Sequence, residues 1–214
     1  MFYKYHPQNY NELKSLLKQL LEERGKDADL NDIDVSNIPD MTRLFEHLDP
    51  HNIDISFWDV SNVRDMRNMF FCCENFTGKG LENWNVDAVI NMKGMFFNCF
   101  KFNANLSNWH VDAVKDMENL FCWCENFTGK GLENWHVDAV ENMRYMFYNC
   151  SKFNANLSNW NVDAVENMQE MFYNCEMFTG QGLENWHVDA VKNMNKMFYN
   201  CSKFNCDLHS WKIY

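Results

Sequence analysis

The stretch from Trp58 to Phe70 reads WDVSNVRDMRNMF, and close copies of it recur along most of the chain. The tryptophan returns at alternating steps of 26 and 25 residues, as Trp58, Trp84, Trp109, Trp135, Trp160, Trp186 and Trp211. A methionine keeps the same period, as Met41, Met66, Met92, Met117, Met143, Met168 and Met194. A fixed period of this length is typical of a repeat protein in which each unit stacks on its neighbours.

Each unit divides into two halves with different hydrophobic patterns. In the first half, Trp84 and Val86 alternate with polar residues, which predicts a short strand. A serine or aspartate follows and is expected to cap a helix, at Ser36, Ser61, Asp87, Asp112, Asp138, Asp163 and Asp189. The second half then places apolar residues along one helical face, at Val63, Met66, Met69, Phe70 and Cys73. The return loop alternates between FTGxGLENW and FNANLSNW, which explains the two step lengths.

One unit buries too little apolar surface to offset its conformational entropy, so the units must share a core. We therefore expect an α/β leucine-rich-repeat solenoid of about seven strand–helix coils, bent into a horseshoe because helices are wider than strands. Residues 1–30 are predicted to form an N-terminal cap, with a short strand and an amphipathic helix. Asn9 and Glu12 form the capping box at the start of this helix, and Gly25 ends it. Residues 31–214 form the solenoid. We identify no C-terminal cap, so the last strand, with Trp211 and Ile213, is a candidate edge for a homodimer.

The units from Trp58 to Phe70 and from Met146 to Asn154 resemble the BspA-like leucine-rich repeat family, over residues of about 30 to 214. Many members of that family are bacterial surface proteins or lipoproteins, and some bind host matrix proteins. The resemblance therefore implies a binding module with a role in cell adhesion, and it transfers no catalytic residue. This chain differs from a surface member in that it begins without an evident export signal or lipid-anchor cysteine, and its tryptophans and methionines replace leucines.

Composition narrows the possible partners. The net charge of −11 disfavours nucleic acid as a partner, and no apolar run is long enough to insert into a membrane.

The nine cysteines include a column of six, which we interpret as reduced packing thiols, because adjacent helices hold such thiols too far apart for a disulfide. The glycine-rich TGxG loops lack the lysine of a phosphate-binding loop and are interpreted as turns. We expect no enzyme activity and no catalytic residue, since no acid, base and nucleophile converge. We also expect no cofactor and no metal, because no second paired cluster completes a zinc site with the C-x-C of Cys122 and Cys124.

The residues on either side of each tryptophan are expected to lie on the concave face, opposite the core. We predict binding through these residues: Phe57, Asp59, Asn83, Asn85, Asn108, His110, Asn134, His136, Asn159, Asn161, Asn185 and His187. A metal contact between His110 and His136 is conceivable, but the sequence offers no third ligand. A purely structural ladder of hydrated hydrogen bonds is the alternative.

The sequence thus predicts a non-enzymatic, adhesin-like module that binds a host or matrix protein, the partner itself being unidentified. The alternative is an intracellular protein-binding scaffold or regulator. The free cysteines and the absence of a signal peptide favour a cytoplasmic location, whereas the resemblance implies the cell surface or secretion.

Overall fold

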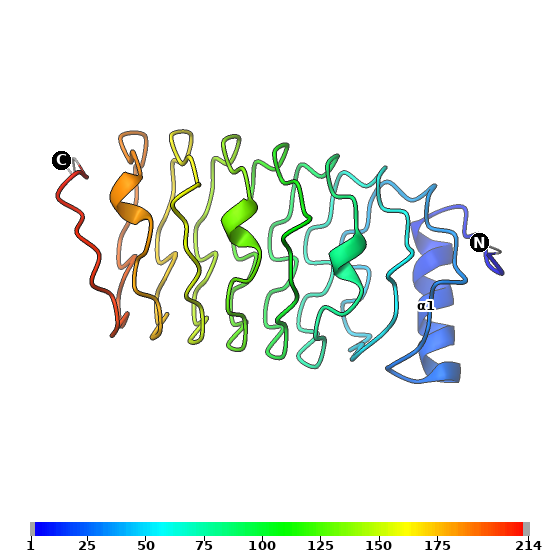
Figure 1. Cartoon of the computed structure of the whole chain (residues 1–214). Coiled ribbons are helices and arrows are strands. Elements are labelled where there is room, and N and C mark those ends of the chain that lie inside the picture. The colour runs from blue at the N-terminus through cyan, green and yellow to red at the C-terminus, as the bar shows by residue number, and fades with distance from the viewer. Residues whose placement is uncertain (1–2, 212–214) are drawn as a thin grey trace.

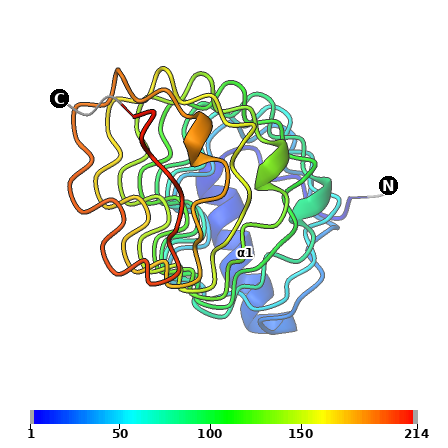
Figure 2. The same cartoon turned by 60° about the vertical axis from the view of Figure 1, so that its left-hand side comes forward.

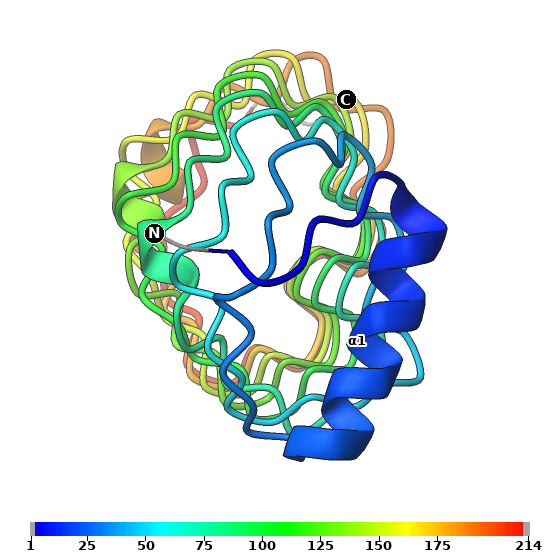
Figure 3. The ribbon, with the colours of Figure 1, turned by 90° about the vertical axis from the view of Figure 1, so that its right-hand side faces the viewer.

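The computed structural model describes residues 3–211 as a stack of coils that follow one another along a single axis (Figure 1). The one α-helix of this range, α1 (Tyr10–Arg24), lies at the N-terminal end of the stack. The view turned by 60° shows the coils one behind another, with the C-terminal coil in front (Figure 2). Seen from the N-terminal end, α1 runs along one flank of the first coils (Figure 3).

The predicted N-terminal helix and its cap are confirmed. The Asn9 side chain accepts a hydrogen bond from the Glu12 N–H at 3.0 Å, and the helix ends at Gly25, whose φ is 86°. The apolar face of α1 is buried against the first coil through Leu13, Leu17, Leu20 and Leu21. The short strand expected before the helix is wrong, because the described residues there form only a single bridge between Tyr5 and Ile33.

The predicted α/β leucine-rich-repeat solenoid is wrong. Between residues 3 and 211, α1 is the only α-helix, and the other helical elements are three short 3-10 turns, η1 (Leu81–Asn83), η2 (Leu132–Asn134) and η3 (Leu183–Asn185). Backbone pairing in the same range consists of isolated parallel bridges, such as Asp65 with Asn91, and builds no sheet. The predicted horseshoe required strands on one side of the stack and wider helices on the other. Residues 3–211 form neither side, so the predicted cause of the bend is absent as well.

Successive tight turns replace the expected helix in each coil. The N–H groups of Met69, Phe71 and Cys73 donate to the carbonyls three residues earlier, at 3.0–3.2 Å. A helix is interrupted because Asn68 and Cys72 have positive φ values of 52° and 57°. This geometry points alternate N–H groups towards the next coil. The Asn68 N–H donates to the Lys93 carbonyl and the Phe70 N–H to the Met95 carbonyl, both at 2.9 Å. Each coil is thereby hydrogen-bonded to the next coil.

Side chains of Asp and Asn form the turns where helix caps were expected. The Ser61 N–H and hydroxyl both donate to the Asp59 carboxylate, so Ser61 starts no helix. Further along the same coil, Asp65 accepts the Arg67 N–H at 3.0 Å. An Asp or Asn two residues before the N–H that it accepts is an Asx turn, which competes with helix formation.

The tryptophans stack on one another instead of lying on strands, Trp58 on Trp84 and then each of the five from Trp109 to Trp211 in the periodic column on the next. Trp109 and Trp135 are stacked with ring centroids 6.4 Å apart and an interplanar angle of 1°. The Trp135 indole N–H donates to the Leu106 carbonyl of the coil before it, at 3.1 Å. The backbone at Trp135 closes a turn onto Leu132. The indole side chains therefore connect neighbouring coils.

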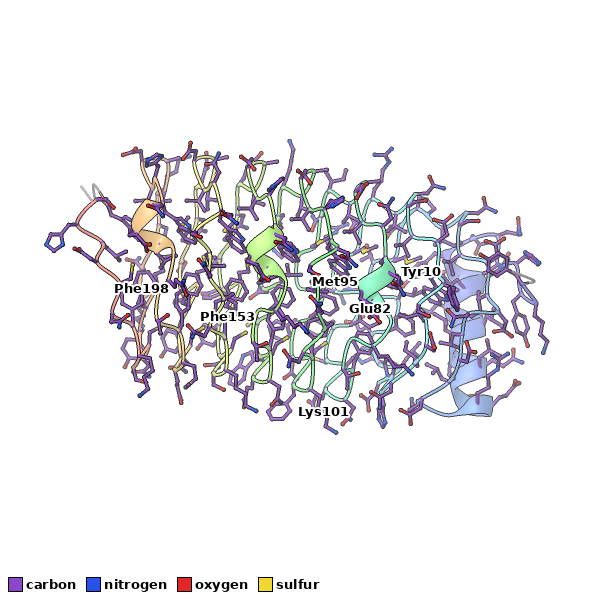
Figure 4. The ribbon with its side chains drawn as sticks, viewed as in Figure 1. Tyr10, Glu82, Met95, Lys101, Phe153 and Phe198 are labelled. Carbon is purple, nitrogen blue, oxygen red and sulfur yellow. The ribbon has the colours of Figure 1, made fainter. Side chains whose placement is uncertain are left out.

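In the inner coils the residues predicted to be core are buried, although the element that carries them differs. The apolar columns have no exposed surface there, as at Met66, Met69, Phe70 and Cys73. In Figure 4, the labelled Met95 and Phe153 lie within the stack, whereas Lys101 projects from its lower edge. The spacing of apolar residues thus predicted which side chains face inward.

The glycine-rich return loops are turns, as predicted. Gly131 has a φ of 95°, and a Cβ at this position would lie 2.3 Å from the Ser107 backbone nitrogen. The longer loop therefore needs a glycine where it crosses the coil before it.

The last coil is less well covered than the inner ones. Its apolar residues Met194, Phe198, Cys201 and Phe204 are only partly buried. The predicted dimer edge includes Ile213, and Lys212 to Tyr214 lie outside the described residues, so the homodimer stays a prediction.

Candidate binding surface

The twelve residues predicted to bind are all exposed and form one surface, which we call the Trp-flanking face. Three of them, Asn83, Asn134 and Asn185, are the last residues of η1, η2 and η3, so the face lies beside these three turns (Figure 1). Its one large apolar side chain is Phe57, with 59% of its surface accessible. The remaining members are Asp59, Asn85, Asn108, His110, His136, Asn159, Asn161 and His187. Because the described coils contain no sheet, this face is built from turns and is not the concave strand surface that the sequence predicted.

Histidine–aspartate pairs join neighbouring coils along this face. The Nδ1 atoms of His110, His136 and His187 lie 3.4, 3.3 and 3.5 Å from a carboxylate of the coil before each of them. Asn161 takes the same place in its own coil, where its side-chain amide donates to Asp138 at 2.9 Å. The polar groups after Trp109, Trp135, Trp160 and Trp186 therefore form one row that crosses the coils.

The asparagines before five of the periodic tryptophans form a second row, at Asn83, Asn108, Asn134, Asn159 and Asn185. The side-chain amides of Asn108 and Asn159 donate to the carbonyls of Glu82 and Glu133 at 3.2 and 3.1 Å. Because these bonds hold one coil to the next, the asparagines have a structural role as well as an exposed position. The hydrogen-bonded ladder considered from the sequence is thus present on this face.

The conceivable metal contact between His110 and His136 does not fit the geometry. Each ring is paired with an aspartate of its own, Asp87 and Asp112 respectively. Within residues 3–211, no group of three or more His, Cys, Asp or Glu side chains is arranged to hold a metal ion.

All nine cysteines lie within the described residues and are free thiols. The column cysteines donate to backbone carbonyls of the coil before them, as Cys150 does to Phe121 at 2.9 Å. Burial raises the pKa of the thiols of Cys99, Cys124, Cys150 and Cys175 well above its usual range. A thiol that stays protonated is a poor nucleophile, so these side chains pack and do not react.

Trp123 is a residue that the sequence analysis did not single out. It is the one tryptophan of eight that falls outside the periodic column, which is the signal that could have identified it. Its side chain is 42% exposed, and its backbone has a positive φ of 65°. A bulky residue in this conformation is uncommon, and such strain is concentrated at functional sites.

The fold and these surfaces define a repeat protein with long, regular rows of exposed side chains. The family model described as "Mycoplasma protein of unknown function, DUF285" matches residues 12–133 and 115–214, and the chain belongs to this family. No curated protein and no solved structure matches the chain. Among the described residues, no helix combines the length and the apolar character that crossing a membrane requires.

Proposed function

We propose that this chain is a non-enzymatic, adhesin-like module that binds a host or matrix protein through the Trp-flanking face. The observation that supports the proposal is the extent of the face, because its rows of exposed side chains continue from Phe57 to His187 without a break in period. Repeat proteins commonly use such extended surfaces for large partners.

The chemistry of the face suits a protein partner. Its amides and imidazoles offer donors and acceptors, and the exposed Phe57 provides an apolar contact at one end. Aromatic residues and polar groups that combine in this way are characteristic of protein-binding surfaces.

The test uses substitutions that the repeat itself contains. Asparagine already stands after the tryptophan at Asn85 and Asn161, so the triple variant His110→Asn, His136→Asn, His187→Asn is expected to fold. Binding of the wild type and of this variant to purified extracellular-matrix proteins is then compared by biolayer interferometry. Trp123→Asn, which lies outside the face, is the matched control.

We expect saturable binding by the wild type and by Trp123→Asn, and at least tenfold weaker binding by the triple variant, a loss of about 1.4 kcal/mol. Equal binding by the triple variant would refute the assignment of the face. An absence of binding to every matrix protein would refute the adhesin-like role.

The alternative of an intracellular scaffold is favoured by one observation, the nine free thiols, which are typical of a reducing compartment. Cross-linking in intact source cells separates the two roles. A cytoplasmic protein that is cross-linked to the wild type but not to the triple variant would support the scaffold.

A further inference from the structure

A partly exposed aromatic row runs along the stack and is interrupted at one coil. Phe71 stacks on Phe97 at 4.8 Å between ring centroids, and Tyr148 stacks on Tyr173 at 4.7 Å. Between these two pairs, the same position is occupied by Cys122, whose side chain is much shorter than a ring. The interruption leaves room beside the row.

A hollow of about 220 Å³ lies at this interruption. It is lined by Asn119, Cys122, Trp123, Tyr145, Tyr148 and Glu170, and we call it the Trp123 hollow. Most small-molecule sites measure roughly 300–1,000 Å³, so this one suits a ligand of the size of a headgroup.

Three aromatic rings meet in the hollow at steep angles. Tyr145 and Tyr148 are perpendicular, at 90° and 5.7 Å between centroids, and Trp123 is inclined to Tyr148 by 52° at 6.1 Å. The Tyr145 ring is held in place because its hydroxyl accepts hydrogen bonds from Arg144 and Gln169. Rings at steep angles around one space form an aromatic cage, which attracts a cation through the negative faces of its rings.

The charge around the hollow favours the same kind of ligand. Glu170 lines the hollow, and Glu125 and Glu176 line an adjoining one that shares Trp123. The Arg144 guanidinium lies 4.5 Å from the centroid of the Tyr145 ring, so this ring attracts cations, and the positive charge of Arg144 offsets part of the negative charge of the three glutamates. Arg144 does not belong to the lining residues of the hollow.

We infer that the Trp123 hollow binds a small quaternary ammonium cation of the choline class. The methyl groups contact the three rings, and the Glu170 carboxylate faces the positive charge. A cation without a phosphate is favoured, since Glu125 and Glu176 repel an anion. This inference is independent of the Trp-flanking face.

The test titrates the full chain with choline chloride and follows binding by isothermal calorimetry. Trp123→Asn removes the central ring, and the fold should tolerate it because asparagine stands at the equivalent position in four other coils, at Asn98, Asn149, Asn174 and Asn200. Phe100→Ser is the matched control, because it removes an exposed ring that lines neither the hollow nor the Trp-flanking face, and serine stands at the equivalent positions Ser151 and Ser202. The uncharged isostere 3,3-dimethylbutanol tests the charge, and phosphocholine tests the tolerance for phosphate.

We expect saturable binding of choline by the wild type and by Phe100→Ser, and at least about fivefold weaker binding by Trp123→Asn. 3,3-Dimethylbutanol and phosphocholine are both expected to bind more weakly than choline. The inference is overturned if choline does not saturate the wild type, if Trp123→Asn binds as well as the wild type, or if the uncharged isostere binds equally. Tighter binding of phosphocholine would overturn the preference for a cation without a phosphate.

Discussion

Truncation of one interior tryptophan should destabilise the chain more than truncation of the last one. Trp135 has no exposed surface and lies between Trp109 at 6.4 Å and Trp160 at 6.5 Å. The substitution Trp135→Ala removes both stacking contacts and leaves a cavity enclosed by two coils. Such truncations cost about 3–5 kcal/mol of unfolding free energy.

Trp211→Ala is the matched control, because Trp211 is 7% exposed and stacks on Trp186 alone among the described tryptophans. Trp211→Ala removes one tryptophan stacking contact where Trp135→Ala removes two, and each such contact contributes about 0.5–1.5 kcal/mol to the free energy of unfolding. Urea unfolding followed by circular dichroism should therefore show that Trp135→Ala costs at least about 1 kcal/mol more than Trp211→Ala. Equal losses in the two variants would refute the argument that the tryptophan stack connects the coils.

Three further predictions concern a carboxylate, a glycine and the thiols. Hydrogen bonds, of which the one from Ser56 has the largest effect, lower the pKa of Asp54 below its ordinary value of 3.8. The Asp54 carboxylate therefore stabilises the fold above pH 3.8, and this contribution to stability is lost as the pH falls below it. Asp54→Asn should narrow the difference between the urea midpoints at pH 6 and pH 3. Gly131→Ala should lower the melting temperature more than Gly25→Ala, because both have a positive φ but only the Cβ at position 131 meets another backbone. A thiol-reactive dye should modify Cys72, the one exposed cysteine, first in the native chain, and rapid modification of all nine would contradict the packing assigned to the buried column.

The sequence predicted the inward-facing residues but not the backbone that carries them. The spacing of Val63, Met66, Met69, Phe70 and Cys73 fits one face of a helix, and a series of tight turns places the same residues inward. Periodicity alone therefore cannot distinguish the two structures. The signal that could have done so was the asparagines at Asn98, Asn149, Asn174 and Asn200, since asparagine tolerates the left-handed conformation that interrupts a helix.

The candidate surfaces were predictable to different degrees. Alternation around each tryptophan predicted that the Trp-flanking face is exposed, because it depends only on neighbours in the sequence. The Trp123 hollow was not predicted, since it joins Asn119, Tyr145 and Glu170 from three coils. Contacts of that kind depend on the register between coils, which the sequence pattern did not supply.

Backbone NMR chemical shifts of residues 63–73 test the turn-built coil most directly. The structure predicts left-handed shifts at Asn68 and Cys72, with continuous helical shifts confined to Tyr10–Arg24 among the described residues. Continuous helical shifts across residues 63–73 would contradict the fold on which both proposed binding surfaces depend.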